Sequence, residues 1–142
     1  MVYLWHGLSI GLGRLIDKVM IMNEHEKINY VEFPARDISK AKAFFTEVFA
    51  WEFEDFGPEY TAFSNQGLDG GFFKSDDTVS AKRGSALIIF FSDNIEATLS
   101  KVEAAGGEIL QPIFYFPGGR RFHFADPNGN EYAVWAQPDT SP

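Results

Sequence analysis

The chain has no cysteine among its 142 residues, which excludes disulfide bonds, thiolate metal ligands and a thiol nucleophile. Basic residues are also scarce, since 12 Lys and Arg stand against 20 Asp and Glu and give a net charge of −8. Nucleic acids and anionic membrane surfaces are bound by basic patches, so neither is an expected partner. The lack of cysteine is compatible with a reducing compartment, and we predict a cytoplasmic location.

A long uninterrupted hydrophobic run is missing as well. The apolar stretch within residues 1–27 is broken by Gly, Arg and Asp, and it falls short of the ~20 apolar residues of a membrane-spanning helix. The same stretch lacks the basic start and the small-residue cleavage site of a signal peptide. We expect residues 1–27 to be an N-terminal extension, either with a helix over 12–22 or artefactual, with Met20 or Met22 as the start.

What the chain has in plenty is apolar and aromatic material. Hydrophobic residues make up 45% of the sequence and aromatic residues 16%, with 15 Phe among them. A chain of this length is expected to form one domain with a substantial core. The pattern of strands and helices begins at residue 28 and ends near 137, which leaves residues 138–142 as a tail.

The first half of the domain, about residues 28–74, has the pattern of a strand, a helix and three strands. Alternation predicts a strand over 28–33, and Asp37 is an N-cap for a helix over 38–49 with apolar residues at helical spacing. Further strands are predicted over 51–54, 60–63 and 68–74.

The second half, about residues 85–136, repeats this order. An apolar strand over 85–91 is followed by a helix over 95–105, capped by Asp93 or Asn94 and ended by Gly106 and Gly107. A strand over 108–115 then leads into a hairpin. Asp37-Ile38 and Asn94-Ile95 lie 94 − 37 = 57 residues apart, and other strand positions match at the same offset. The sequence therefore predicts an α+β domain of two tandem βαβββ repeats.

The most informative stretch is the hairpin at the end, RRFHFADPNGNEYAVWA over residues 120–136. Aromatic and β-branched residues alternate on both sides of the turn Asp126-Pro127-Asn128-Gly129-Asn130, whose residue types are those of tight turns. Local chemistry alone supports no more than a β-hairpin here.

The doubled βαβββ unit that ends in DPNGN resembles the vicinal oxygen chelate superfamily of glyoxalases, bleomycin-resistance proteins and extradiol dioxygenases. The resemblance covers about residues 28–137. Within it, VEFPARDISKAKAFFTEVFAWEFED, VEAAGGEIL and the hairpin are similar to the subgroup of predicted enzymes related to lactoylglutathione lyase. The resemblance implies partly open, curled sheets that form a cleft, and a homodimer. It specifies the fold far better than the reaction, because the superfamily includes both enzymes and drug-binding proteins.

Metal-dependent members of this superfamily carry His, Gln or Glu at four positions in the cleft. By position, these sites correspond here to Tyr30, Leu87, Ala133 and a residue near Gly71, and the last three offer no side-chain lone pair. No cofactor is therefore predicted, and the usual metal site is expected to be missing. An atypical divalent-metal set of Glu32, His123 and Glu131 stays open, although Glu131 follows the turn and is expected to be solvated.

The remaining side chains of the expected cleft suit a small molecule. Arg121 could bind a carboxylate, Glu32 and His123 could exchange a proton, and aromatic side chains could stack on a ring. For Arg121 the alternative is a solvated pair with Arg120. The predicted ligand-binding residues are Tyr30, Glu32, Leu87, Arg121, His123, Ala133 and Trp135, with Glu32 and His123 as candidate catalytic residues.

Three functions are compatible with these residues. The first is a metal-free module that binds a small aromatic or carboxylated molecule, and this is the function we favour. The second is a lyase, isomerase or dioxygenase that uses the Glu32 and His123 pair or an atypical metal set. The third is a structural or regulatory subunit whose cleft is filled by its own aromatic side chains, such as Phe72, Phe91, Phe114 and Tyr115.

Overall fold

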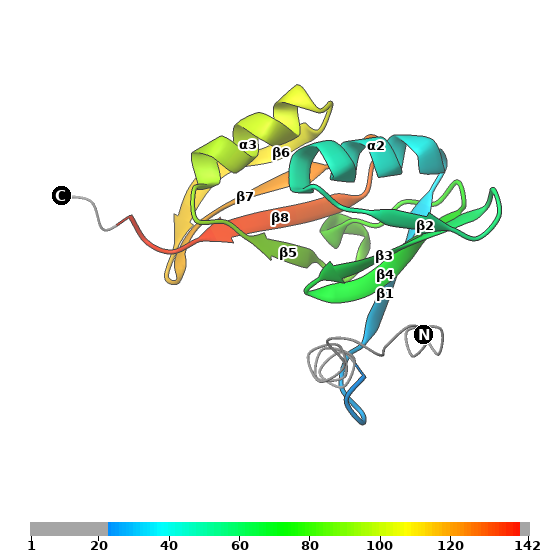
Figure 1. Cartoon of the computed structure of the whole chain (residues 1–142). Coiled ribbons are helices and arrows are strands. Elements are labelled where there is room, and N and C mark those ends of the chain that lie inside the picture. The colour runs from blue at the N-terminus through cyan, green and yellow to red at the C-terminus, as the bar shows by residue number, and fades with distance from the viewer. Residues whose placement is uncertain (1–22, 140–142) are drawn as a thin grey trace, which may run out of the picture.

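A computed structural model describes residues 23–139, so the helix predicted over 12–22 lies outside the described residues. The two βαβββ repeats are confirmed (Figure 1). The first repeat consists of β1 (Tyr30–Ala35), α2 (Ile38–Phe49), β2 (Phe53–Asp55), β3 (Tyr60–Gln66) and β4 (Leu68–Lys74). A short 3₁₀ helix, η2 (Ala81–Arg83), lies in the linker. The second repeat consists of β5 (Ile88–Phe91), α3 (Ile95–Ala104), β6 (Glu108–Phe116), β7 (Gly119–Ala125) and β8 (Glu131–Ala136).

Each repeat forms its own four-stranded mixed sheet, with strand order β1-β4-β3-β2 in the first and β5-β8-β7-β6 in the second. In each sheet the first strand pairs in parallel with the last strand of its repeat. Glu32 pairs with Gly71, and Ile89, which lies 89 − 32 = 57 residues further on, pairs with Ala133. Gly71 is therefore the first-repeat counterpart of Ala133, as the offset predicted.

The helices begin where the sequence predicts. The Asp37 side chain accepts a hydrogen bond from the backbone N–H of Lys40 at 3.0 Å, and Asn94 rather than Asp93 caps α3 through the N–H of Ala97 at 3.1 Å. Two strands begin later than predicted. β5 starts at Ile88 because pairing with β8 starts there. β2 starts at Phe53 because Trp51 is buried in the core.

One continuous aromatic core joins the two repeats. Both helices lie on the same side of the sheets (Figure 1). Phe45 of α2 lies 5.3 Å, between ring centroids, from Tyr132 of β8, and Phe33 of β1 lies 5.2 Å from the same ring. Each such ring contributes about 1.5–3 kcal/mol when fully buried. Because residues alternate along a strand, the opposite face of each sheet presents a different set of side chains.

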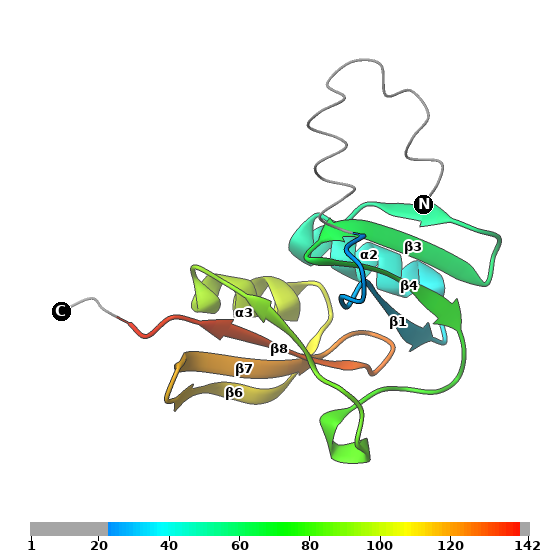
Figure 2. The same cartoon turned by 90° about the horizontal axis from the view of Figure 1, so that it is seen from below.

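The DPNGN turn does more than join β7 to β8. The Asn128 amide pairs with the backbone of Asp37, accepting from its N–H at 2.8 Å and donating to its carbonyl at 3.0 Å. Asn130, which is fully buried, donates to the Pro34 carbonyl at 2.7 Å and accepts from the Val79 N–H at 2.9 Å. In Figure 2 the linker that carries η2 runs from the first repeat to the second. The turn therefore fastens the second repeat both to the first repeat and to the linker.

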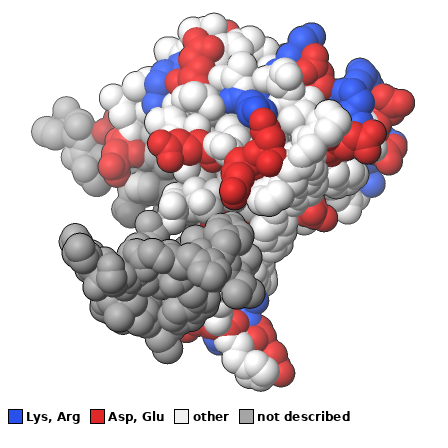
Figure 3. Space-filling view, turned by 45° about the vertical axis from the view of Figure 1, so that its right-hand side comes forward, with Lys and Arg blue, Asp and Glu red and all other residues white. Residues whose placement is uncertain are grey.

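The surface is consistent with the predicted lack of a basic patch. On the face shown in Figure 3, Lys and Arg side chains are interspersed with Asp and Glu side chains. Within residues 23–139, no helix has both the length and the hydropathy needed to span a membrane.

Candidate functional site

A hydrogen-bonded chain of three side chains crosses the open face of the second sheet. Arg121 donates from Nε and Nη2 to Nε2 of His123, at 3.2 and 2.9 Å. The other ring nitrogen of His123 lies 2.9 Å from Oε2 of Glu131. Glu131 in turn accepts from the backbone N–H of Ala81 at 3.0 Å, so the linker supports the chain from behind.

This chain assigns the tautomer of His123. Because the guanidinium can only donate, Nε2 is the acceptor, and the ring proton lies on Nδ1 and is donated to Glu131. Both ring nitrogens are thus occupied, and His123 is only 6% exposed. Glu131 is 8% exposed, so the expectation that it is solvated was wrong. It is buried because the chain gives its carboxylate two partners.

A hollow opens directly beside Arg121. Its volume is about 390 Å³, and it is lined by Ile89, Phe116, Gly118, Arg121 and Trp135. The guanidinium carbon lies 5.8 Å from the ring centroid of Phe116 and 5.9 Å from that of Phe114, within cation–π range. The hollow is therefore an apolar surface with one cation at its edge.

Arg120 and Arg121 are not a solvated pair. Arg120 forms an ion pair with Glu96 of α3, and the hydrogen bond from Arg120 lowers the pKa of that carboxyl below its ordinary value. Arg121 lies on the opposite face of β7. Alternation along the strand separates the two cations and leaves only Arg121 at the hollow.

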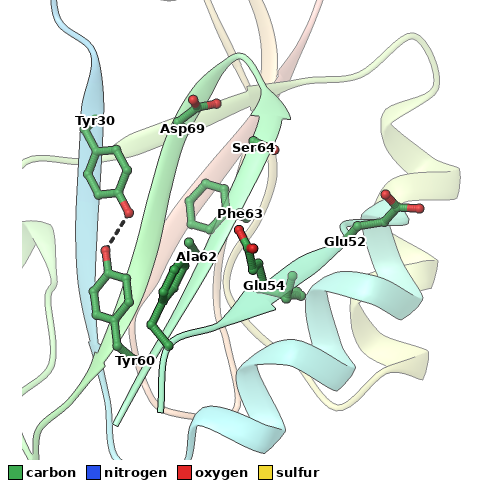
Figure 4. Close-up of a pocket in the computed structure, with 10 residues that line it drawn as sticks. Tyr30, Glu52, Glu54, Tyr60, Ala62, Phe63, Ser64 and Asp69 are labelled. Carbon is green, nitrogen blue, oxygen red and sulfur yellow. Dashed lines mark hydrogen bonds between the residues drawn. The ribbon is translucent and has the colours of Figure 1, made fainter. Parts of the chain in front are cut away.

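The open face of the first sheet carries a second polar cluster. The Tyr60 hydroxyl donates to Oε2 of Glu32 at 2.8 Å, and because each hydroxyl has one proton, Tyr30 is the donor in the 2.5 Å contact between the two phenols (Figure 4). Tyr60 can lie here because position 71 is a glycine. A Cβ on Gly71 would come within 2.3 Å of the Tyr60 oxygen.

A hollow of about 580 Å³ adjoins this cluster, with aromatic walls and acidic side chains. Figure 4 shows Asp69, Glu52 and Glu54 among its residues. Partial burial raises the pKa of Tyr60 well above its ordinary value, and the hydrogen bonds with Tyr30 and Glu32 raise it further. The phenol therefore serves as a stable hydrogen-bond donor to Glu32.

The raised tyrosine pKa values predict an alkaline loss of stability. Burial, and then the charge of Asp126, also raises the pKa of Tyr132. Above the ordinary tyrosine pKa of about 10, the unfolded chain releases protons that the folded chain retains, so the stability is present below this pH and is lost as the pH rises. We expect the free energy of unfolding to fall less steeply above about pH 10 in Tyr132→Phe than in the parent protein. Denaturant titrations at a series of pH values measure both slopes, and equal slopes would contradict the assignment.

The predicted ligand-binding residues are spread over three hollows. Arg121 and Trp135 line the hollow of the second sheet, with His123 behind Arg121 and Ala133 fully buried. Tyr30 lines the hollow of the first sheet, with Glu32 hydrogen-bonded beside it. Leu87 lines a third, apolar hollow of about 590 Å³ that includes residues of β1 and β5.

The residues at the four family positions do not fit a divalent metal ion. Gly71, Leu87 and Ala133 have no donor atom, and the Tyr30 hydroxyl is hydrogen-bonded to Tyr60. Within residues 23–139, no three His, Asp or Glu side chains come together in a way that could hold a metal ion. The alternative set of Glu32, His123 and Glu131 is therefore not assembled, because Glu32 lies on the other sheet with Tyr60 as its partner. We derive no step through a metal.

The aromatic residues named for a filled cleft have different positions. Phe72 is buried in the core, Tyr115 is 77% exposed, and Phe114 packs against His123 with ring centroids 5.9 Å apart. The hollow beside Arg121 stays open, which argues against a cleft closed by the protein's own side chains.

Sequence reasoning missed Tyr60, Ile89 and Phe116 as members of these sites. The alternation of β5 around the Leu87 position could have placed Ile89 on the open face. For Tyr60, a bulky aromatic residue on a strand that neighbours a glycine pair was a usable signal, because glycine in a strand often accommodates a close approach.

Known proteins with similar sequences and structures agree with this architecture. A family model described as the Glyoxalase/Bleomycin resistance protein/Dioxygenase superfamily matches residues 27–134. A glyoxylase-like domain-containing protein of Didymella fabae is 25% identical over 80% of this chain and 96% of its own length. The anthracycline biosynthesis protein DnrV of Streptomyces peucetius is 30% identical over 70% of this chain, which spans only 42% of DnrV.

Among solved structures, the fosfomycin resistance protein FosX of Listeria monocytogenes superposes with a TM-score of 0.67 at 20% identity, covering 80% of this chain and 94% of FosX. At this identity the likeness concerns the fold alone. Together with the family match over most of the domain, it leads to one conclusion: the chain belongs to the glyoxalase/bleomycin-resistance/dioxygenase superfamily.

Proposed function

We propose that this protein is a small-molecule binding module whose ligand lies in the Arg121 hollow and is held without a metal ion. The observation that carries the proposal is a positioned cation beside an apolar surface. A mostly apolar concavity with a few convergent polar groups is the usual form of a small-molecule site. The volume of about 390 Å³ falls within the ~300–1,000 Å³ range of such sites.

Catalysis by Glu32 and His123 receives less support. General acid–base catalysis requires both groups to reach one substrate. Here Glu32 is bound to Tyr60 on the first sheet, and His123 is bound on both sides within the second sheet. The homodimer and the cytoplasmic location stay predictions, which sedimentation velocity and cell fractionation can test.

A fragment screen tests the proposed function. Neutral, anionic and cationic fragments are added to the full chain in the presence of a chelator, and binding is followed through the NMR signal of the Trp135 indole N–H. We expect hits that shift this signal and that lose about 10-fold or more in affinity in Arg121→Met. Arg120→Met is the matched control, since it removes a neighbouring cation from the other face of the same strand. A screen in which no fragment shifts the Trp135 signal would refute the proposal.

A further inference from the structure

We infer that the ligand of the Arg121 hollow carries a carboxylate on a flat apolar body, and that His123 and Glu131 are positioning residues that aim Arg121 at it. This inference rests on the proposed function and adds the chemical class of the ligand. Three features of the site support it: the donors that Arg121 has left, the composition of the walls, and the charge balance.

The first feature is the pair of donors that Arg121 does not use within the protein. Nε and Nη2 form the side edge of the guanidinium, and both donate to His123. The end edge, with one N–H of Nη1 and the second N–H of Nη2, has no hydrogen-bond partner among residues 23–139. Two parallel N–H groups in one plane match the two oxygens of a carboxylate.

The second feature is the shape of the surroundings. Trp135 packs edge-to-face against Phe91 and Phe116, with centroids 5.0 and 6.5 Å apart, so its ring is held in place. Ile89 is 43% exposed at the same hollow. These rigid apolar surfaces suit a flat ring, and the hollow is near the small end of the usual size range, which favours a body of one or two rings.

The third feature is charge. Arg121 is the only charged residue among those that line this hollow, and it repels a cationic ligand. A phosphate group carries about −1.5 to −2 charges and is usually bound by several basic groups. A single carboxylate is matched by a single guanidinium.

His123 and Glu131 hold the guanidinium in its orientation. His123 accepts from the side edge, Glu131 fixes the His123 ring, and the Ala81 N–H fixes Glu131. His123 does not line the hollow, so it acts on the ligand only through Arg121. An arginine that is ordered before binding loses less conformational freedom when the ligand arrives.

The test compares three probes of nearly equal shape: naphthoate, naphthamide and naphthylmethylamine. Their dissociation constants are measured on the full chain through the Trp135 indole N–H signal. We expect naphthoate to bind about 10-fold or more tightly than the amide, and the amine to bind most weakly. The ratio of amide to naphthoate constants should fall to about one in Arg121→Met and stay unchanged in Arg120→Met.

The positioning role has its own readout. His123→Leu should lower this ratio several-fold while the affinity for the amide stays the same, and His123→Gln should restore part of it because its amide oxygen can accept from Arg121. A purely structural role would weaken both probes alike. If His123→Leu does not fold, Glu131→Ala is used instead, with the same expected fall in the ratio.

The possible failures are distinguishable. If naphthamide and naphthylmethylamine shift the Trp135 signal as tightly as naphthoate does, the carboxylate inference is overturned and the proposed site stands. If none of the probes shifts the signal, the inference and the proposed site both fail for flat aromatic ligands. An unchanged ratio in the His123 and Glu131 variants overturns the positioning role.

Discussion

Asn130→Ala is expected to lower the free energy of unfolding by about 2–4 kcal/mol, which corresponds to roughly 10 °C in Tm for a domain of this size. Asn130 is fully buried, and its amide satisfies the Pro34 carbonyl of β1 and the Val79 N–H of the linker. Alanine would leave both backbone groups buried without these partners. Each unsatisfied group costs about 1–3 kcal/mol. Chemical denaturation monitored by circular dichroism measures the loss.

The matched control is Asn23→Ala. Asn23 is exposed, and its side chain accepts from the Asn29 side chain at 3.0 Å. Its removal should change the stability by less than about 0.5 kcal/mol. Similar losses in the two variants would show that the turn does not connect the repeats as described.

A second large effect is expected at Gly70 in β4. A Cβ at this position would lie 2.3 Å from the Val31 carbonyl oxygen and 2.6 Å from the Phe63 ring. The carbonyl belongs to the neighbouring strand, so Gly70→Ala must push β1 and β4 apart. Overpacking in a core typically costs 1–3 kcal/mol, and we expect about 3 kcal/mol or more here because backbone has to move.

Gly71 provides the comparison for this prediction. A Cβ there would meet mainly the end of the Tyr60 side chain, at 2.3 Å from its oxygen. Gly71→Ala should therefore destabilise less in a Tyr60→Ala background than in the parent protein. The corresponding Phe63→Ala background should not rescue Gly70→Ala, because the Val31 carbonyl remains in place. Equal rescue at both glycines would contradict the distinction between backbone and side-chain contact.

The order of elements could be predicted because local chemistry and the repeat agree. Asp37 and Asn94 are good N-caps, and each precedes an apolar face at helical spacing. The offset of 57 residues then predicts the second repeat from the first, down to the pairing of Ile89 with Ala133. The strand starts at Phe53 and Ile88 were not predicted because they depend on tertiary packing and pairing.

The grouping of the site residues could not be predicted in the same way. Alternation correctly puts Arg121 and His123 on one face, but it cannot tell that their side chains bond to each other. Nor does it show that an exposed-looking Glu131 is buried by a contact with the linker, fifty residues earlier in the chain. The side-chain amides of the DPNGN turn are a similar case, since their partners lie in the first repeat.

The most direct test of the central claim is calorimetric titration of naphthoate into the full chain, with a chelator in excess and then with added divalent metal ions. If Arg121 holds the ligand without a metal ion, the affinity is the same under both conditions. It then falls about 10-fold or more in Arg121→Met, and Arg120→Met behaves like the parent protein. Binding that requires added metal, or that is equally weakened in both arginine variants, would contradict the account.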